Sequence, residues 1–234
     1  MTIQVHTHMS IPLTIDQSLP DLSGKIMALI GDLSTRRNQI VKQFILDGFQ
    51  NEGSTCVVTL TISANELIDE LSQYSPEASM IVNDAILNER LQIVDMYSFR
   101  GMDTSEDIPG THILPAANDL TVLSITLNKI LQTHPKCRVT IWPFSLLAIY
   151  TQHSDLINFT QTLAARLSSR NQAGLLVMNR GVVRDEERVS LESIVDSVLE
   201  TKRVEEDGAI EEYFRVKFFR GSDENEYELW TPMS

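Results

Sequence analysis

One stretch of the sequence has the spacing of a phosphate-binding loop. In many ATPases this loop has the pattern G-x-x-x-x-G-K-[ST], in which glycines admit the phosphates, lysine neutralises them and a hydroxyl binds Mg²⁺. Here Gly31 supplies the first glycine, but Arg36 replaces the second glycine, Arg37 the lysine and Asn38 the Ser/Thr. The frame of the loop is kept, and the groups that phosphate chemistry needs are replaced. The positions considered as a degenerate phosphate-loop site, open to an anion or a partner, are Gly31, Ser34, Thr35, Arg36, Arg37 and Asn38.

Two interpretations of the Arg36-Arg37 pair remain open. The pair could bind an anion or a partner's carboxylate at a helix N-terminus. It could equally be a solvated pair on a loop that has lost its function, because the helix dipole disfavours cations there by only about a few tenths of a kcal/mol.

No other group of residues supplies a catalytic arrangement. His6 and His8 could be two metal ligands on one strand face, but no third ligand is identifiable, so no metal site is predicted. Ser145 follows a predicted strand but lacks the G-x-S-x-G context of a nucleophile. Cys56 and Cys137 each lie inside an apolar run and are expected to be buried thiols, with no metal spacing or disulfide framework.

The loop is positioned by a predicted β-α unit. An apolar run over residues 26–30 reads as a buried strand, Gly31 as the turn, and a 3.6-residue period begins a helix at about Asn38. The apolar side of this helix consists of Ile40, Val41, Phe44, Ile45 and Phe49.

The rest of the chain repeats this alternation. The predicted strands at 55–61, 91–96, 138–142 and 173–178 are nearly all apolar, which is typical of a parallel sheet covered on both faces. The predicted fold is therefore a three-layer α/β fold, with helices at 64–74, 77–87, 119–131, 144–150 and 156–169.

The end of the chain breaks the alternation. Closing strands at 194–202, 212–219 and 226–231 predict an antiparallel C-terminal extension, while 97–117 and 184–188 are expected to be loops. Residues 1–23 are interpreted as a lead that adds an edge strand or packs over the fold. No linker divides the chain further, so residues 24–234 are predicted to be a single domain.

Composition restricts the function classes. Against 32 Asp and Glu there are 19 Lys and Arg, a net charge of −13, so general nucleic-acid binding is not expected. No apolar run approaches the roughly 18 residues of a membrane helix, and the N-terminus lacks the pattern of a signal peptide. A cytoplasmic protein without membrane association is predicted.

The layout and the residues at its junctions resemble the RecA-superfamily ATPases of the KaiC and archaeal RadA-like group. The resemblance covers roughly residues 22–232. The stretches that carry it are GKIMALIGDLSTRRNQIVKQFILDGFQNEGSTCVVTL, RVTIWPFSLL and IVDSVLETKRVEEDGAIEEYFRVKFFRG. It implies a RecA-like fold, with a phosphate loop in the first stretch and the Walker B strand in the second.

The chain departs from that pattern at three catalytic elements. Besides the loop itself, Trp142 occupies the position of the Walker B Asp, and Thr61 and Ile62 lie where the family places a catalytic Glu. Trp142 is interpreted as an aromatic side chain that fills a vacated nucleotide pocket, with stacking on a ligand base as the alternative.

The resemblance also implies a role for Arg220. In the family, the Lys and Arg of a K-x-R-G hairpin reach towards a neighbouring subunit's nucleotide. Here Phe218 replaces the Lys, while Arg220 and Gly221 remain. Arg220 is thus a candidate for action in trans, and the alternative is an exposed ion pair with Asp223 or Glu224.

The leading hypothesis is a catalytically inactive RecA/KaiC-like domain, a pseudo-ATPase that acts as a regulatory or scaffolding subunit. Its expected partner is a protein, either an active RecA-like relative or a second copy, and no cofactor is expected. The alternatives are a protein that binds ATP with Mg²⁺ but does not hydrolyse it efficiently, and an ATPase that depends on a partner. The family includes proteins of recombination, clock timing, archaeal motility and signal transduction. The acidic charge balance makes direct DNA handling the least expected of these, and the process that the chain serves stays open.

Overall fold

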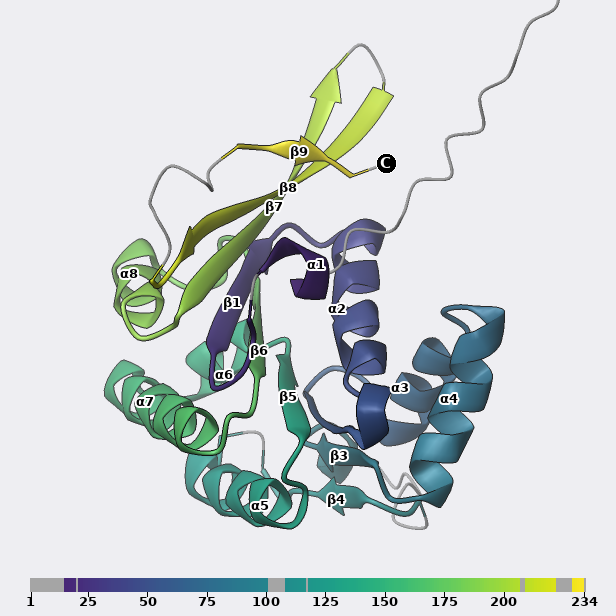
Figure 1. Ribbon diagram of the computed structural model, residues 1–234. Helices are drawn as coiled ribbons and strands as arrows, with labels where there is room; N and C mark the ends of the chain where they lie inside the picture. The colour runs from purple at the N-terminus through teal and green to yellow at the C-terminus, as the bar shows by residue number, and fades with distance from the viewer. Residues whose placement is uncertain are drawn as a thin grey trace, which may run out of the picture.

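The computed structural model describes residues 15–19, 21–100, 108–116, 118–206, 209–221 and 229–233. Within these ranges, nine strands form one sheet in the order β4-β3-β2-β5-β6-β1-β7-β8-β9 (Figure 1). Strands β4 to β7 in this order are parallel, whereas β7, β8 and β9 are antiparallel. The strands are β1 (Ile26–Gly31), β2 (Ser54–Thr59), β3 (Leu91–Asp95), β4 (Thr111–Ile113), β5 (Cys137–Trp142), β6 (Gly174–Asn179), β7 (Ser197–Glu206), β8 (Ala209–Phe219) and β9 (Thr231–Pro232).

Helices pack on both faces of this sheet (Figure 1). Helices α1 to α4 contribute to the apolar cluster on one face, and α5 to α8 to the cluster on the other. The helices are α1 (Ile15–Ser18), α2 (Thr35–Asp47), α3 (Ala64–Ser72), α4 (Pro76–Leu87), α5 (Leu120–Thr133), α6 (Ser145–Tyr150), α7 (His153–Ser169) and α8 (Asp185–Glu192), with 3-10 turns at Gln50–Glu52 and Ser98–Arg100.

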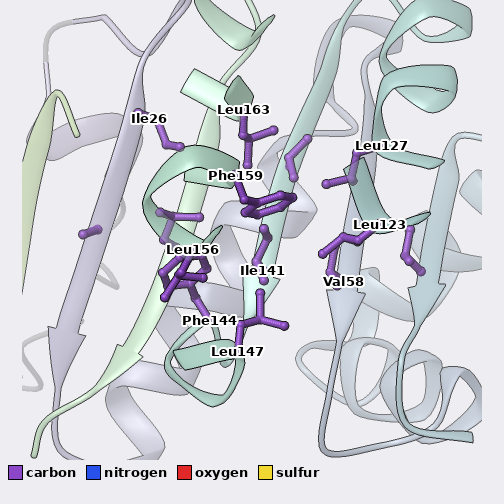
Figure 2. Close-up of a cluster of buried hydrophobic side chains, with 14 of the residues drawn as sticks. Ile26, Val58, Leu123, Leu127, Ile141, Phe144, Leu147, Leu156, Phe159 and Leu163 are labelled. Atoms are coloured by element: carbon purple, nitrogen blue, oxygen red, sulfur yellow. The ribbon is translucent and has the colours of Figure 1, made fainter. Parts of the chain in front are cut away.

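The residues of β1 are all apolar because both faces of this strand are covered. Ile26 and Ile30 point into the cluster beneath α5–α8, while Met27 and Leu29 point into the cluster beneath α1–α4, and all four are buried. Figure 2 shows the first of these clusters, with side chains of α5 and α7 gathered over the strands. The strand is buried on both faces, as a central strand of a parallel sheet should be.

The predicted three-layer α/β fold with an antiparallel C-terminal extension is confirmed. Two predicted loops were wrong. Residues 184–188 were expected to be a loop but lie largely in α8, where Asp185, Glu186 and Glu187 occupy the first turn and favour a helix N-terminus. The expected loop over 97–117 contains the edge strand β4, which pairs with β3.

The beginning of the chain contributes a helix to the core. Ile15 and Leu19 of α1 are buried beside α2, and Asp16 pairs with Arg138 at 2.6 Å. Residues 1–14, which include His6 and His8, lie outside the described residues. That residues 24–234 form a single domain stays a prediction. Among the described helices, none has both the length and the apolar character needed to cross a membrane.

Both cysteines are buried free thiols on the neighbouring strands β2 and β5, as predicted. Burial raises the pKa of the Cys137 thiol to about 12 and also raises that of Cys56. They are protonated core side chains at neutral pH.

Candidate functional site

The phosphate-loop positions lie at the carboxyl end of β1, where ligands of open α/β sheets bind. Gly31 is the last residue of β1, and Ser34 is the N-cap of α2, accepting a hydrogen bond from the Arg37 N–H at 3.2 Å. Helix α2 therefore begins at Thr35 and not at about Asn38 as predicted, because the Ser34 side chain caps it.

Arg37 is buried within this loop. Its side chain is 0% exposed, and its Nη1 donates to the Gly31 carbonyl at 3.0 Å and to Asn179 Oδ1 at 2.9 Å. The interpretation as a solvated pair is wrong for this residue. Because the guanidinium folds back onto the ends of β1 and β6, the chain's own cation occupies the inside of the loop.

The burial of Arg37 is only partly compensated. Its Nε and Nη2 are buried without a hydrogen-bond partner among the described residues, as is Asn38 Oδ1. Burial lowers the pKa of the guanidinium, and the charge of Asp32 opposes that shift. Unpaired buried donors are costly, so other contacts must hold this arrangement in place.

Strand β7 closes one side of the loop. A Cβ added to Gly31 would lie 1.9 Å from Thr201 Oγ1, so glycine is required by the close approach of β7. Arg180 reinforces the approach: its backbone N–H donates to the Gly31 carbonyl at 2.8 Å and its Nη2 to the Thr201 carbonyl at 3.0 Å. Its Nε also lies 3.5 Å from Asp32 Oδ1.

The C-terminal strands contact two further polar side chains of the loop, those of Ser34 and Arg36. Ser34 Oγ donates to Glu212 Oε2 of β8 at 3.1 Å, and Arg36 Nη1 donates to the Met233 carbonyl. The backbone N–H of Met233 donates to the Glu212 carbonyl at 2.7 Å. The side chains of Ser34, Arg36 and Arg37 are therefore each bonded to a distant part of the same chain.

Trp142 ends β5 opposite Thr59, the last residue of β2. Its partly buried ring packs against the apolar cluster of α1–α4, an environment consistent with a core aromatic. A cis peptide bond joins it to Pro143.

Neither residue at the position where the family places a catalytic Glu carries a carboxylate. Thr61 is exposed and Ile62 is half-buried, and the Ile62 carbonyl accepts a hydrogen bond from Thr59 Oγ1 at 2.7 Å. The nearby carboxylate of Asp95 is occupied, because it accepts from Ala64 N, Ser98 N and other donors of its own loop. In the described part of the chain, no group of three His, Cys, Asp or Glu could hold a metal ion.

Arg220 lies at the end of the strands opposite to the phosphate loop. Phe219 pairs with Ser197, which pairs with Met27 near the start of β1, whereas the loop follows the end of β1. The exposed Arg220 side chain donates through Nη2 to the carbonyls of Ser193 and Val195, at 3.0 and 3.2 Å. These acceptors are backbone carbonyl groups, and Asp223 and Glu224 lie outside the described residues.

The residues that contact the loop from other strands could not be predicted from the sequence. Asn179, Thr201 and Glu212 come from β6, β7 and β8, and only the sheet order brings them to the loop. A hollow of about 850 Å³ lies between α5 and α7, with Asp119 and Arg166 among its lining residues. It is separate from the phosphate loop.

Comparison with known proteins agrees with the fold. The KaiC-like protein PH0186 from the hyperthermophilic archaeon Pyrococcus horikoshii OT3 has a similar structure, with a TM-score of 0.64 and 16% sequence identity over 90% of this chain and 85% of that one. At this identity the similarity shows the fold alone. No curated protein matches the chain. A model of the family described as "ATPase: KaiC" matches residues 16–230, and the chain therefore belongs to the KaiC ATPase-domain family.

Proposed function

We propose that this chain is a non-catalytic member of its family that acts as a regulatory or scaffolding subunit through protein contacts. The observation that carries the proposal is the fully buried Arg37 guanidinium, bound to the Gly31 carbonyl and to Asn179. A phosphate that entered the loop would have to displace it and leave Asn179 Oδ1 without its donor.

The electrostatic needs of phosphoryl transfer support the same proposal. The reaction depends on positioned cations, Mg²⁺ ligands and an oriented water. At the corresponding positions the chain has Asn38 in place of a hydroxyl, Trp142 in place of Asp, and Thr61 and Ile62 in place of Glu. Three separate requirements of hydrolysis are unmet.

Exposed apolar side chains support a role in protein contacts. On α4, Met80 is 69% exposed and Leu87 is 82% exposed. A groove of about 410 Å³ with a mainly apolar lining lies beside Met80, between α4 and the C-terminal end of α2. Phe49, which follows α2, is one of its lining residues. We propose an active RecA-like relative or a second copy as the partner, with neither ATP nor a metal as a cofactor.

A phosphate-release assay tests the absence of catalysis. Wild type and Arg37→Ala are incubated with Mg-ATP over hours, and we expect both to release phosphate at the rate of buffer alone. Turnover by the wild type that is lost in Arg37→Ala would overturn the proposal, because it would give Arg37 the role of the missing lysine.

The proposal includes a role in trans for Arg220. Arg220 lies at the end of the strands opposite to its own phosphate loop, so it could act only on the nucleotide of a neighbouring subunit. The ATPase rate of an active relative is measured alone, with this chain, and with Arg220→Ala, using Arg203→Ala on β7 as the exposed control. Stimulation lost only in Arg220→Ala supports the role. Equal stimulation by all three forms would leave a scaffold without a contribution from Arg220.

A further inference from the structure

The last described residues of the chain lie against the mouth of the phosphate loop. The Met233 carbonyl accepts from Arg36, and the Met233 N–H donates to Glu212, whose carboxylate accepts from Ser34. Ser34 is the N-cap of α2, and Arg36 lies in the first turn of that helix. A carboxylate and a carbonyl of the chain thus lie beside a helix N-terminus, the place where phosphate loops receive anions.

An aromatic anchor holds this segment in place. The ring of Trp230 is contacted by two cations, with Lys202 Nζ 4.4 Å and Arg215 Cζ 4.5 Å from its centroid. Arg215 is itself fixed by an ion pair with the buried Glu200, with Nε at 2.7 Å from the carboxylate. Cations at these distances from an indole face are attracted to it. The segment is also held by strand β9, which follows Trp230 and pairs with β8 (Figure 1).

A second observation points to unused donors behind this segment. Arg37 is fully buried, yet its Nε and Nη2 have no hydrogen-bond partner among the described residues. The loop therefore holds more positive hydrogen-bonding capacity than the chain satisfies, in a protein whose net charge is −13.

From these contacts we infer that residues 230–233 and Glu212 form a latch that closes the phosphate loop against external anions. Opening the latch frees Ser34 and Arg36 and lets a polyanion reach the N-terminus of α2. The inference rests on the proposed non-catalytic loop and adds its regulation: the resting chain fills the anion position with its own oxygens. When the competent state is a minor fraction, the apparent affinity falls by that fraction, so a latch closed nine-tenths of the time weakens binding about tenfold.

The test measures binding of inorganic pyrophosphate, without Mg²⁺, by isothermal titration to full-length variants. Trp230→Ala removes the anchor, and Met233→Pro removes the N–H that donates to Glu212. Leu229→Ala is the matched control, because this neighbouring side chain is 88% exposed. We expect at least tenfold tighter binding by the first two variants than by wild type and Leu229→Ala, and loss of that gain when Arg36→Gln is added.

Two results would overturn the latch. One is an unchanged dissociation constant in both opened variants, with circular dichroism showing that they are folded. The other is a gain that persists with Arg36→Gln, which would place the anion elsewhere. Neither result bears on hydrolysis, and ATP turnover by the wild type would overturn the proposed function without deciding the latch.

Discussion

The Arg37 guanidinium donates to Asn179 Oδ1 at 2.9 Å and so joins the first turn of α2 to the last residue of β6. The Asn179 N–H in turn donates to Ser145 Oγ at 3.1 Å, at the start of α6. The Arg37 side chain is thus part of the fold's internal hydrogen bonding. Its substitution should be detected first as a change in stability.

A double-mutant cycle tests the bond between Arg37 and Asn179. Asn179→Leu removes an acceptor from a buried cation and should cost about 1.5–3 kcal/mol of unfolding free energy. Arg37→Met removes the cation, fills similar space and should cost about 1 kcal/mol or less, as replacement of buried charges often does. In the Arg37→Met background, Asn179→Leu should cost much less than it does alone.

Urea unfolding of the four proteins measures this coupling, with Asn158→Leu on the exposed side of α7 as the control. If the two effects simply add, within about 0.5 kcal/mol, the contact does not stabilise the loop.

The close approach of β7 to the loop predicts a rescue. Gly31→Ala places a methyl group against Thr201 Oγ1 and should cost about 1–3 kcal/mol through overpacking. Thr201→Ala removes that oxygen, which has no hydrogen-bond partner among the described residues, and should recover more than half of the loss. Thermal unfolding of both single variants and the double variant decides the point. A double variant no more stable than Gly31→Ala would show that the strain lies elsewhere.

A buried carboxyl group at the other end of α2 predicts a pH effect. Burial raises the pKa of Asp47 above its ordinary 3.8, against the opposing hydrogen bond from Gln43, which donates at 2.7 Å. A folded-state pKa above the unfolded one means that folding favours the protonated acid. The stability this supplies is fully present below about pH 3.8 and is lost as the pH rises through the folded-state pKa.

Asp47→Asn keeps an acceptor for Gln43 without the charge. The variant should therefore be more stable than wild type at pH 7, and the difference should shrink as the pH approaches 3.8. Denaturation at a series of pH values measures it, with Asp69→Asn on the exposed side of α3 as the control. A difference that does not change with pH would mean that the charge of Asp47 has no part in it.

Local patterns were enough to predict much of the fold. The unbroken apolar run of β1 and the 3.6-residue period of α2 are properties of neighbouring residues, and they located the loop correctly. Helix α8 was missed because its charged residues leave only a narrow apolar face, on which Leu191 is buried.

The site itself depends on distant residues. Arg37 meets Asn179 142 positions away, and Ser34 meets Glu212 178 positions away. Nothing near Arg37 in the sequence shows that it would be buried, since arginine is seldom fully buried without a paired charge. The partners of Arg220 were missed for a related reason, because backbone carbonyl groups leave no mark in the sequence.

The most direct test of a loop closed to nucleotide is the melting temperature of the wild-type protein with and without millimolar Mg-ATP. A ligand at about 100 times its dissociation constant stabilises by about 2.7 kcal/mol, and a domain of this size gains about 2–4 °C for each kcal/mol. Because Arg37 is buried inside the loop and the proposed function leaves the chain without Mg²⁺ ligands, we expect no rise beyond that given by the same concentration of sodium sulfate. A rise of several degrees that requires both ATP and Mg²⁺ would contradict the closed loop and would make the chain a nucleotide-binding protein.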